Sequence, residues 1–335
     1  MSSVALRESV AAVVNGRKPS HIGLLLERYV PAVDAPKAYD KRNMVLDAVR
    51  ARHEGLTLYR KAYVRWLGFL EADSEFTETV IFRLDSRLFI GLGGASALEF
   101  GVSLHHTYGY PMIPGAGVKG LCAAYADAFG GEWAAGERNH AALFGAPKTE
   151  DRPDTAGAVD FLDAWWVPFK EGEEHPNPFK ADVVTCHHPG YYTGKGGEEY
   201  APPLDSDAPV PVSLVSVTGG FCFAVRGPKE WRDLAMEILR RALAEWGIGG
   251  KTRAGYGRFT DPLAEFRHIL NANARNPARV MDRLLGDIRK QEDEGLRKRM
   301  AGMVLAVHGP ETLRRARRDK KAWFVFLDAI AEEGA

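Results

Sequence analysis

The chain has 335 residues, of which 45% are apolar and 26% are charged, a composition typical of a soluble globular protein with one large or two ordinary domains. Its 44 lysines and arginines are balanced by 44 acidic residues, which argues against a free-standing, tight nucleic-acid binder, because such proteins are usually basic. No apolar run is long enough to cross a membrane, and residues 1–20 resemble neither a secretory signal nor a transit peptide.

Three widely spaced cysteines, Cys122, Cys186 and Cys222, form no paired-ligand motif. This spacing argues against a zinc site and against a disulfide framework, and it favours a cytoplasmic protein. We therefore expect no metal and no cofactor.

The first 76 residues of the chain are predicted to be mainly helical. Helix-forming composition covers residues 4–14, 21–30, 38–53 and 56–71. Alternating apolar residues at 77–84 then predict the first strand. Apolar residues recur at helical spacing from Val118 to Phe129, which predicts a helix over residues 116–129 that ends before Gly130.

The second half alternates strands and helices around one long irregular stretch. We expect a strand over residues 157–167, an irregular segment over 168–211, a tight hairpin of strands 212–218 and 221–225 about Gly219 and Gly220, a helix over 231–246, and a strand over 254–260. Beyond Pro262 the pattern is helical to the end, and it includes the basic run Arg314-Arg315-Ala316-Arg317-Arg318. That run is either a solvated helical face or a phosphate contact, and the sequence favours the solvated face.

Without its flanks, this order reads strand, helix, strand, strand, helix, strand. It predicts an α+β protein with a ferredoxin-like β-α-β-β-α-β core, similar to RNA-recognition domains, carrying a long insertion and helical N- and C-terminal extensions. We expect three parts: a helical region at 1–76, the core at 77–261 with its insertion at 168–211, and a helical extension at 262–335.

The most informative segment runs from Gly249 to Phe259, where four glycines stand among Lys251, Arg253, Tyr256 and Arg258. Glycines that let another backbone approach closely, beside cationic and aromatic side chains, suit a phosphodiester strand. The alternative is a tight helix-to-strand turn. A nucleotide-binding P-loop is rejected, because position 245 is Glu rather than Gly and because the helix precedes the loop.

A second glycine-bearing segment, Ile113-Pro114-Gly115 through Val118-Lys119-Gly120, opens the helix at 116–129. A helix N-terminus favours an anion, and Lys119 adds positive charge in the first turn. The alternative is that Pro114 and Gly115 only cap the helix while Lys119 is solvated.

Together these two segments resemble the RAMP superfamily of CRISPR-associated proteins. A third segment, His187-His188-Pro189-Gly190-Tyr191-Tyr192 with the proline-rich residues after it, makes the chain look like the sixth subunit of the type III-B (Cmr) RNA-guided effector complex. The resemblance covers roughly residues 77–261 and is specific at all three segments.

The resemblance implies a noncatalytic RNA-binding backbone subunit that serves antiviral defence, holds the guide RNA toward its 3′ end and contacts neighbouring RAMP subunits. Its partners would be the CRISPR guide RNA, the target RNA and other Cmr subunits, with no membrane and no small-molecule substrate. The 168–211 insertion would be the projecting hairpin of such proteins. The residues carried over to RNA binding are Lys119, Lys251, Thr252, Arg253, Tyr256, Arg258, His187, His188, Tyr191 and Tyr192.

The alternative is a stand-alone, metal-independent CRISPR endoribonuclease of the same fold, since some relatives cleave precursor RNA with a histidine. The candidates are His105, His106, His187 and His188, because histidine moves protons near neutral pH. Adjacent histidines on an extended segment point to opposite faces, which favours the scaffold hypothesis, with no catalytic residue.

Overall fold

A computed structural model describes residues 21, 23–24, 55–94, 101–150, 153–168, 177–188, 191, 202, 204–207, 209–261, 263–273, 276–291, 294–308 and 310–332. The chain divides into two compact units, Met1–Thr260 and Asp261–Ala335. The expected helices at 4–14 and 38–53 lie outside the described residues, as does nearly all of 21–30.

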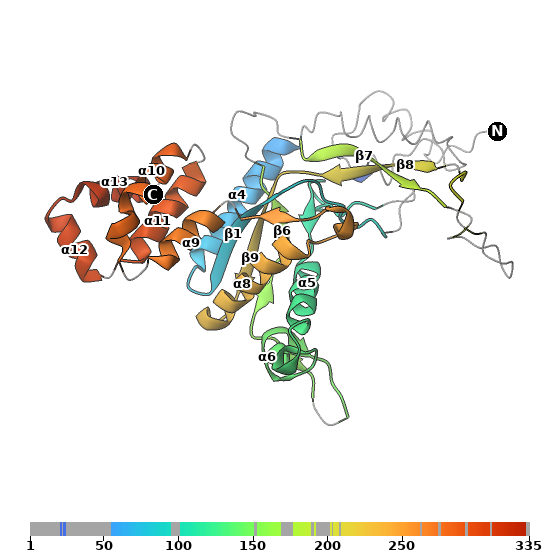
Figure 1. Cartoon of the computed structure of the whole chain (residues 1–335), viewed down its shortest axis with the longest axis horizontal. Coiled ribbons are helices and arrows are strands. Elements are labelled where there is room, and N and C mark those ends of the chain that lie inside the picture. The colour runs from blue at the N-terminus through green and yellow to red at the C-terminus, as the bar shows by residue number, and fades with distance from the viewer. Residues whose placement is uncertain are drawn as a thin grey trace. The chain divides into compact units, whose positions relative to one another are not determined.

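An antiparallel sheet organises the first unit (Figure 1), with the strand order β10-β1-β9-β6-β2 and β5 paired to β9. Its strands are β1 (Thr77–Leu84), β2 (Met112–Ile113), β5 (Asp160–Phe161), β6 (Ala164–Trp166), β9 (Gly220–Arg226) and β10 (Phe259–Thr260). The central strand β9 is buried from Gly220 to Val225, as expected of a strand with neighbours on both edges. The α+β class is thereby confirmed at the level of an antiparallel sheet with packed helices.

Two helices that the sequence predicts pack against each other beside this sheet. Helix α5 (Gly115–Asp127) and helix α8 (Lys229–Glu245) lie close to the expected 116–129 and 231–246. Each buries an apolar stripe at helical spacing, with Val118 and Cys122 on α5 and Leu239 and Ala242 on α8. A hydrogen bond of 2.8 Å from the Tyr125 hydroxyl to Glu245 Oε2 joins the two helices near their C-terminal ends.

Further elements complete the first unit. They are α4 (Leu56–Ala72), the 3-10 turn η1 (Gly131–Trp133), α6 (Arg138–Phe144), and the short pair β3 (Gly145–Ala146) and β4 (Thr155–Ala156). Helix α4 matches the helix expected at 56–71, and its Tyr59 hydroxyl donates to the Trp166 carbonyl at 2.7 Å. Leu56 and Tyr59 of this helix are buried in the main apolar core.

The hairpin predicted about Gly219 and Gly220 is wrong. The strand predicted at 212–218 is present as β8 (Val210–Val217), but it pairs along its whole length with β7 (Phe179–Cys186) and not with β9. Strand β7 lies inside the segment that the sequence predicted to be irregular. Strand β9 cannot take β8 as a partner, because β1 occupies one of its edges and β5 and β6 occupy the other. Gly219, with φ of 107°, carries the chain from one sheet into the other.

Two other strands are shorter than predicted. The strand expected at 157–167 is broken into β5 and β6 at Leu162 and Asp163, a local irregularity that turns the Asp163 carboxylate toward α5. The strand expected at 254–260 is extended only at β10, because residues 252–254 form the 3-10 turn η2 and Gly255 and Gly257 have positive φ.

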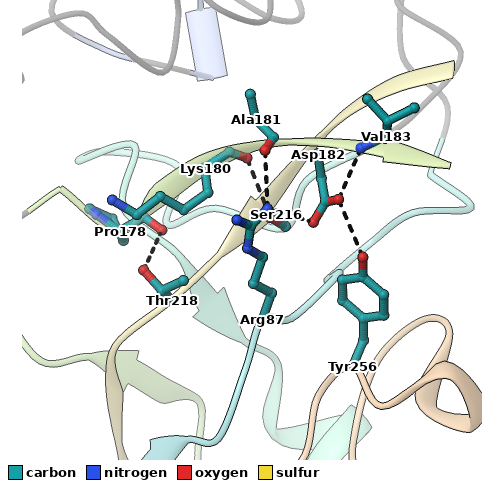
Figure 2. Close-up of polar contacts among 9 residues, drawn as sticks. All are labelled: Arg87, Pro178, Lys180, Ala181, Asp182, Val183, Ser216, Thr218 and Tyr256. Atoms are coloured by element: carbon teal, nitrogen blue, oxygen red, sulfur yellow. Dashed lines mark hydrogen bonds and ion pairs between the residues drawn. The ribbon is translucent and has the colours of Figure 1, made fainter. Parts of the chain in front are cut away.

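Strands β7 and β8 form a two-stranded arm, the β7–β8 ribbon, which Figure 1 shows extending away from the sheet. Its base is held by the polar contacts in Figure 2. Arg87 Nη1 donates to Asp182 Oδ2 at 3.0 Å and to the Ala181 carbonyl at 3.1 Å, and the Tyr256 hydroxyl donates to Asp182 Oδ1 at 3.3 Å. Asp182 is only 11% exposed, so the ribbon is joined to the core through a nearly buried carboxylate.

The second unit is helical, as predicted beyond residue 262. It contains α9 (Ala264–Ala272), η3 (Pro277–Val280), α10 (Met281–Lys290), α11 (Glu294–Ala306), α12 (Pro310–Arg318) and α13 (Ala322–Glu332). Leu284, Leu285 and Ile288, which share one face of α10, are buried in a separate core, and Val280 packs against it. Among the described residues, no helix is both long and apolar enough to span a membrane.

We expect Gly115→Ala to lower the free energy of unfolding by about 1–3 kcal/mol, because a side chain there forces the backbone apart. A Cβ at Gly115 would lie 2.2 Å from the Phe161 carbonyl oxygen, where α5 begins against β5. Gly120→Ala is the matched control: it lies in the same helix with open space around it, and it should raise stability by about 0.5–1 kcal/mol. Urea unfolding compares the two, and equal stability would contradict this packing.

We expect Asp182→Ala to loosen the β7–β8 ribbon while leaving the sheet intact, because Arg87 and Tyr256 lose their shared acceptor. A loss of about 1 kcal/mol corresponds to about fivefold faster amide exchange in residues 179–186 and 210–217. Hydrogen exchange measures this, with the exposed Asp205→Ala as control. Unchanged exchange in the ribbon would show that its anchor lies elsewhere.

Candidate nucleic-acid interface

The glycine-rich segment and the start of α5, which are more than 120 residues apart in sequence, line one hollow of about 740 Å³. The α5 side contributes Pro114, Gly117 and Leu121, and the glycine-rich side contributes Thr252, Arg253 and Arg258. The remaining lining residues are Ile90, Ile113, Glu245, Trp246, Gly247, Ile248 and Gly249. The two segments that the sequence selected are therefore brought together.

Backbone contacts of residues 247–258, the glycine loop, fix its path along the segment that follows β1. The Gly250 amide donates to the Phe89 carbonyl at 2.8 Å, and the Gly257 amide donates to the Arg87 carbonyl at 2.7 Å. A Cβ at Gly257 would lie 1.9 Å from the Ile248 carbonyl oxygen, so no other residue fits there without a shift. The structure explains this glycine by close backbone packing, as the tight-turn alternative requires.

Close packing of the glycines leaves the cations of the loop pointing outward. Lys251 and Arg253 are exposed, and Arg258 is half-buried with its Nη1 donating to the Ala244 carbonyl at 3.3 Å. Lys251 adopts the left-handed conformation with φ of 60°, which is uncommon for a residue with a side chain and costs about 1–2 kcal/mol. The loop thus holds a lysine in a strained position at the surface.

Lys119 does not lie with these cations. Gly117 and Leu121 face the hollow, and Lys119 is two residues from each, about 200° around the helix at 100° per residue. It is exposed on the far side of α5. The first turn of α5 is instead occupied from within the chain, since the Gly115 amide donates to Asp163 Oδ1 at 2.7 Å.

The charged residues that line the hollow are of both signs: Arg253, Arg258 and Glu245. Glu245 accepts the hydrogen bond from Tyr125, and its charge contributes to the raised pKa of that hydroxyl, after burial and the bond itself. The lining also includes Trp246, which is 40% exposed. Neither Glu245 nor Trp246 was predicted as a site residue from the sequence, although a tryptophan directly before the C-terminal glycine of a helix is a signal that could have identified them.

Tyr256 faces into the chain. Its ring lies 4.6 Å from the ring of Phe89, and its hydroxyl donates to Asp182. Burial, followed by the nearby Asp182 carboxylate, raises the pKa of this hydroxyl. Tyr256 therefore joins the glycine loop to the β7–β8 ribbon.

The histidine- and tyrosine-bearing segment lies in the insertion, and none of its described residues lines the hollow. His187 is exposed, and His188 Nδ1 lies 3.0 Å from Asp207 Oδ2, a contact that lowers the pKa of Asp207. The Tyr191 amide donates to the His188 carbonyl at 3.2 Å. Tyr192 lies outside the described residues.

The other two nuclease candidates have packing or backbone contacts. The ring of His105 lies 4.6 Å from Tyr108 and 4.7 Å from Trp165, and burial lowers its pKa. The His106 carbonyl accepts a hydrogen bond of 3.0 Å from His21 Nε2. In the part of the chain that the structure describes, no group of three or more His, Cys, Asp or Glu side chains is arranged to hold a metal ion.

Comparison with known proteins gives a family and several relatives. A family model described as the RAMP superfamily matches residues 81–260. The protein "CRISPR system Cmr subunit Cmr6" of Pyrococcus furiosus is 25% identical over 268 residues, which cover 64% of this chain and 76% of that protein. The chain is thus similar in sequence to Cmr6 over most of the relative's length.

Two solved structures also match. One is a chain of the cryo-EM structure of the type III-B Cmr-β complex bound to cognate target RNA, with a TM-score of 0.48, 22% identity, and coverage of 66% of this chain and 70% of that chain. The other is the crystal structure of Cmr6 from Pyrococcus furiosus, with a TM-score of 0.32, 24% identity, and coverage of 55% and 97%.

The family match includes both glycine-bearing segments of the hollow. It begins within β1, contains α5 and the whole glycine loop, and ends at the last residue of β10. Because the RAMP superfamily model matches residues 81–260, more than half of the 335 residues, the chain belongs to the RAMP superfamily.

Proposed function

We propose that this protein is a noncatalytic RNA-binding subunit of a type III-B CRISPR (Cmr) effector complex, and that it holds the guide RNA toward its 3′ end for antiviral defence. One observation carries the proposal: the glycine loop lines a hollow together with the start of α5 and presents Lys251 and Arg253 to solvent and Arg258 to the hollow. The guide phosphates lie against these three cations, and the hollow accepts the strand beside them.

The strand order supports a ferredoxin-like core. Strands β1 and β6, joined through α5, lie on either side of β9, and β9 and β10, joined through α8, lie on either side of β1. Two such split β-α-β units, interleaved in one antiparallel sheet, are what a ferredoxin-like fold requires. The sequence similarity to a protein named as a Cmr subunit supports the proposed role in a Cmr complex.

The charge distribution suits a subunit that shares its RNA with neighbours. With a net charge of zero, the whole chain does not attract polyanions from a distance, so binding depends on a few local cations. Three phosphate contacts contribute a salt slope of about −2 for single-stranded RNA, which is small for a stand-alone binder. The protein acts within a cytoplasmic complex, in which adjacent RAMP subunits supply the remaining contacts.

The β7–β8 ribbon contacts a neighbouring subunit or the guide–target duplex. It extends from the sheet, and its anchor at Asp182 includes Tyr256 of the glycine loop. His187, His188 and Tyr191 belong to the same insertion and contact RNA from there, as does Tyr192. Lys119 binds a separate part of the RNA path, on the opposite side of α5.

We expect Lys251→Ala, Arg253→Ala and Arg258→Ala together to weaken binding of a single-stranded guide RNA about fiftyfold at 0.15 M salt, and to reduce the log–log salt slope by about 2. This loss corresponds to slightly less than a fourfold decrease in affinity, about 3.8-fold, for each lost phosphate contact. Fluorescence anisotropy at several salt concentrations measures both quantities.

The matched control for this triple variant is Arg138→Ala, Lys148→Ala and Lys229→Ala, which removes the same charge from exposed positions that do not line the hollow. Equal losses in both triple variants would contradict a specific site and leave only general electrostatic attraction. The RNA should remain uncut throughout these incubations in EDTA, and cleavage would contradict the noncatalytic role.

We expect Lys251→Gly to separate the charge of this residue from its backbone strain. Glycine adopts the left-handed conformation freely, so Lys251→Gly should be about 1 kcal/mol more stable than Lys251→Ala, while both lose about fourfold in RNA affinity. Thermal unfolding and anisotropy check the two expectations. RNA affinity equal to that of the parent in both variants would remove Lys251 from the interface.

A further inference from the structure

A second hollow of about 630 Å³ lies within the helical unit Asp261–Ala335, beyond the residues matched by the family model. Its volume is in the range of pockets that bind small organic groups. Aromatic, cationic, and amide or hydroxyl side chains all line it: Trp323 and His308, Arg315 and Lys321, and Asn276 and Thr312. This combination is chemically distinct from an apolar docking groove.

Two of these side chains form a stacked aromatic pair. The rings of His308 and Trp323 lie 4.8 Å apart with an angle of 28° between their planes. His308 Nδ1 lies 2.7 Å from the Val304 carbonyl, which places the ring hydrogen on Nδ1 and fixes the ring against Trp323. A rigid stacked pair at a solvent-accessible hollow provides a surface on which a nucleobase stacks at low entropic cost.

The rim of the hollow is positively charged. Arg315 and Lys321 line it, and none of its described lining residues is acidic. Both belong to residues 310–321, which contain six lysines and arginines against two acidic residues, although the other four cations do not line the hollow. One of the acidic residues, Asp319, has its pKa lowered by the hydrogen bond from Arg318 and is ionised at neutral pH. Asp319 Oδ1 lies 3.0 Å from Arg318 Nε, and Asp319 Oδ2 lies 3.7 Å from Arg315 Nε. A single carboxylate is therefore shared between two guanidinium groups. This one carboxylate does not neutralise both guanidinium groups, so net positive charge remains beside the hollow to attract RNA phosphates.

We propose that the helical unit Asp261–Ala335 carries a second single-stranded RNA site, in which a base stacks in the hollow beside Trp323 and His308 and the flanking phosphates contact Arg315 and Lys321. Asn276 and Thr312 supply hydrogen bonds to the polar edge of the base. This site is separate from the interface of the RAMP core and does not depend on the function proposed for that interface.

The positions of the cations on α12 provide a control. Thr312, Arg315 and Ala316 share the face that lines the hollow, whereas Arg314 lies on the opposite side of the same helix. Lys290, at the end of α10, is also exposed and does not line the hollow. Arg314→Ala with Lys290→Ala therefore removes the same charge as Arg315→Ala with Lys321→Ala.

The test measures binding of a short fluorescein-labelled single-stranded RNA to the full chain that already carries the Lys251, Arg253 and Arg258 alanine substitutions, so that the core interface does not contribute. Arg315→Ala with Lys321→Ala should weaken the remaining binding about fifteenfold at 0.15 M salt and reduce the salt slope by about 1.4. The control pair should leave it close to the starting value. Equal effects of the two pairs would overturn the proposal.

The aromatic contact has an independent test, photocrosslinking of RNA that contains 4-thiouridine to the full chain. Crosslinks are expected in the peptide that contains His308 to Trp323, and Trp323→Leu should remove them and weaken binding about tenfold. Trp323→Phe, which keeps a ring, should preserve both. Crosslinks confined to residues 1–260 would overturn this site while leaving the proposed function of the core intact.

Discussion

The organisation of the first unit depends on the close approach of two backbones, the glycine loop and the segment that follows β1. Hydrogen bonds from Gly250 to Phe89 and from Gly257 to Arg87 hold them together, and the Ile248 carbonyl lies where a side chain of Gly257 would be. A Cβ at Gly249 would lie 2.2 Å from the Phe89 carbonyl oxygen, so the loop can follow this path only because Gly249 has no side chain. On that path, Phe259 enters the sheet beside Leu84, and Arg253 and Arg258 line the hollow.

Because one loop has several neighbours, its parts are mechanically linked. Its last residues precede strand β10, its middle residues form one wall of the hollow, and Tyr256 holds Asp182 at the base of the β7–β8 ribbon. The hydrogen bond between Tyr256 and Asp182 joins two buried or half-buried side chains, so it fixes the point at which the ribbon leaves the core. In the proposed role, the guide RNA contacts the loop and a neighbour contacts the ribbon, and the hydrogen bond from Tyr256 to Asp182 connects these two parts of the chain.

Local sequence patterns predicted the helices and the loop, because these features depend mainly on residues that are close together in the chain. The apolar stripes of α5 and α8 set both helices to within a few residues, and the glycine-rich composition identified the loop. The pairing of β8 could not be predicted in this way, because it depends on β9 having both edges occupied by strands from distant parts of the chain. Lys119 was grouped with Arg253 because it lies in the first turn of a helix and because of the family resemblance, whereas its angular position on α5 places it on the far side.

A neutral chain is compatible with a polyanionic ligand when its cations are fixed in place and its carboxylates are occupied. Glu245, within the hollow, accepts a hydrogen bond from the Tyr125 hydroxyl. Asp182 accepts hydrogen bonds from Arg87 and Tyr256, so both carboxylates have partners inside the protein. Lys251, in contrast, is held at the surface by a strained backbone. Local arrangement, rather than total charge, decides the sign of the field that a strand meets at close range, since salt screens exposed charges beyond about 10 Å.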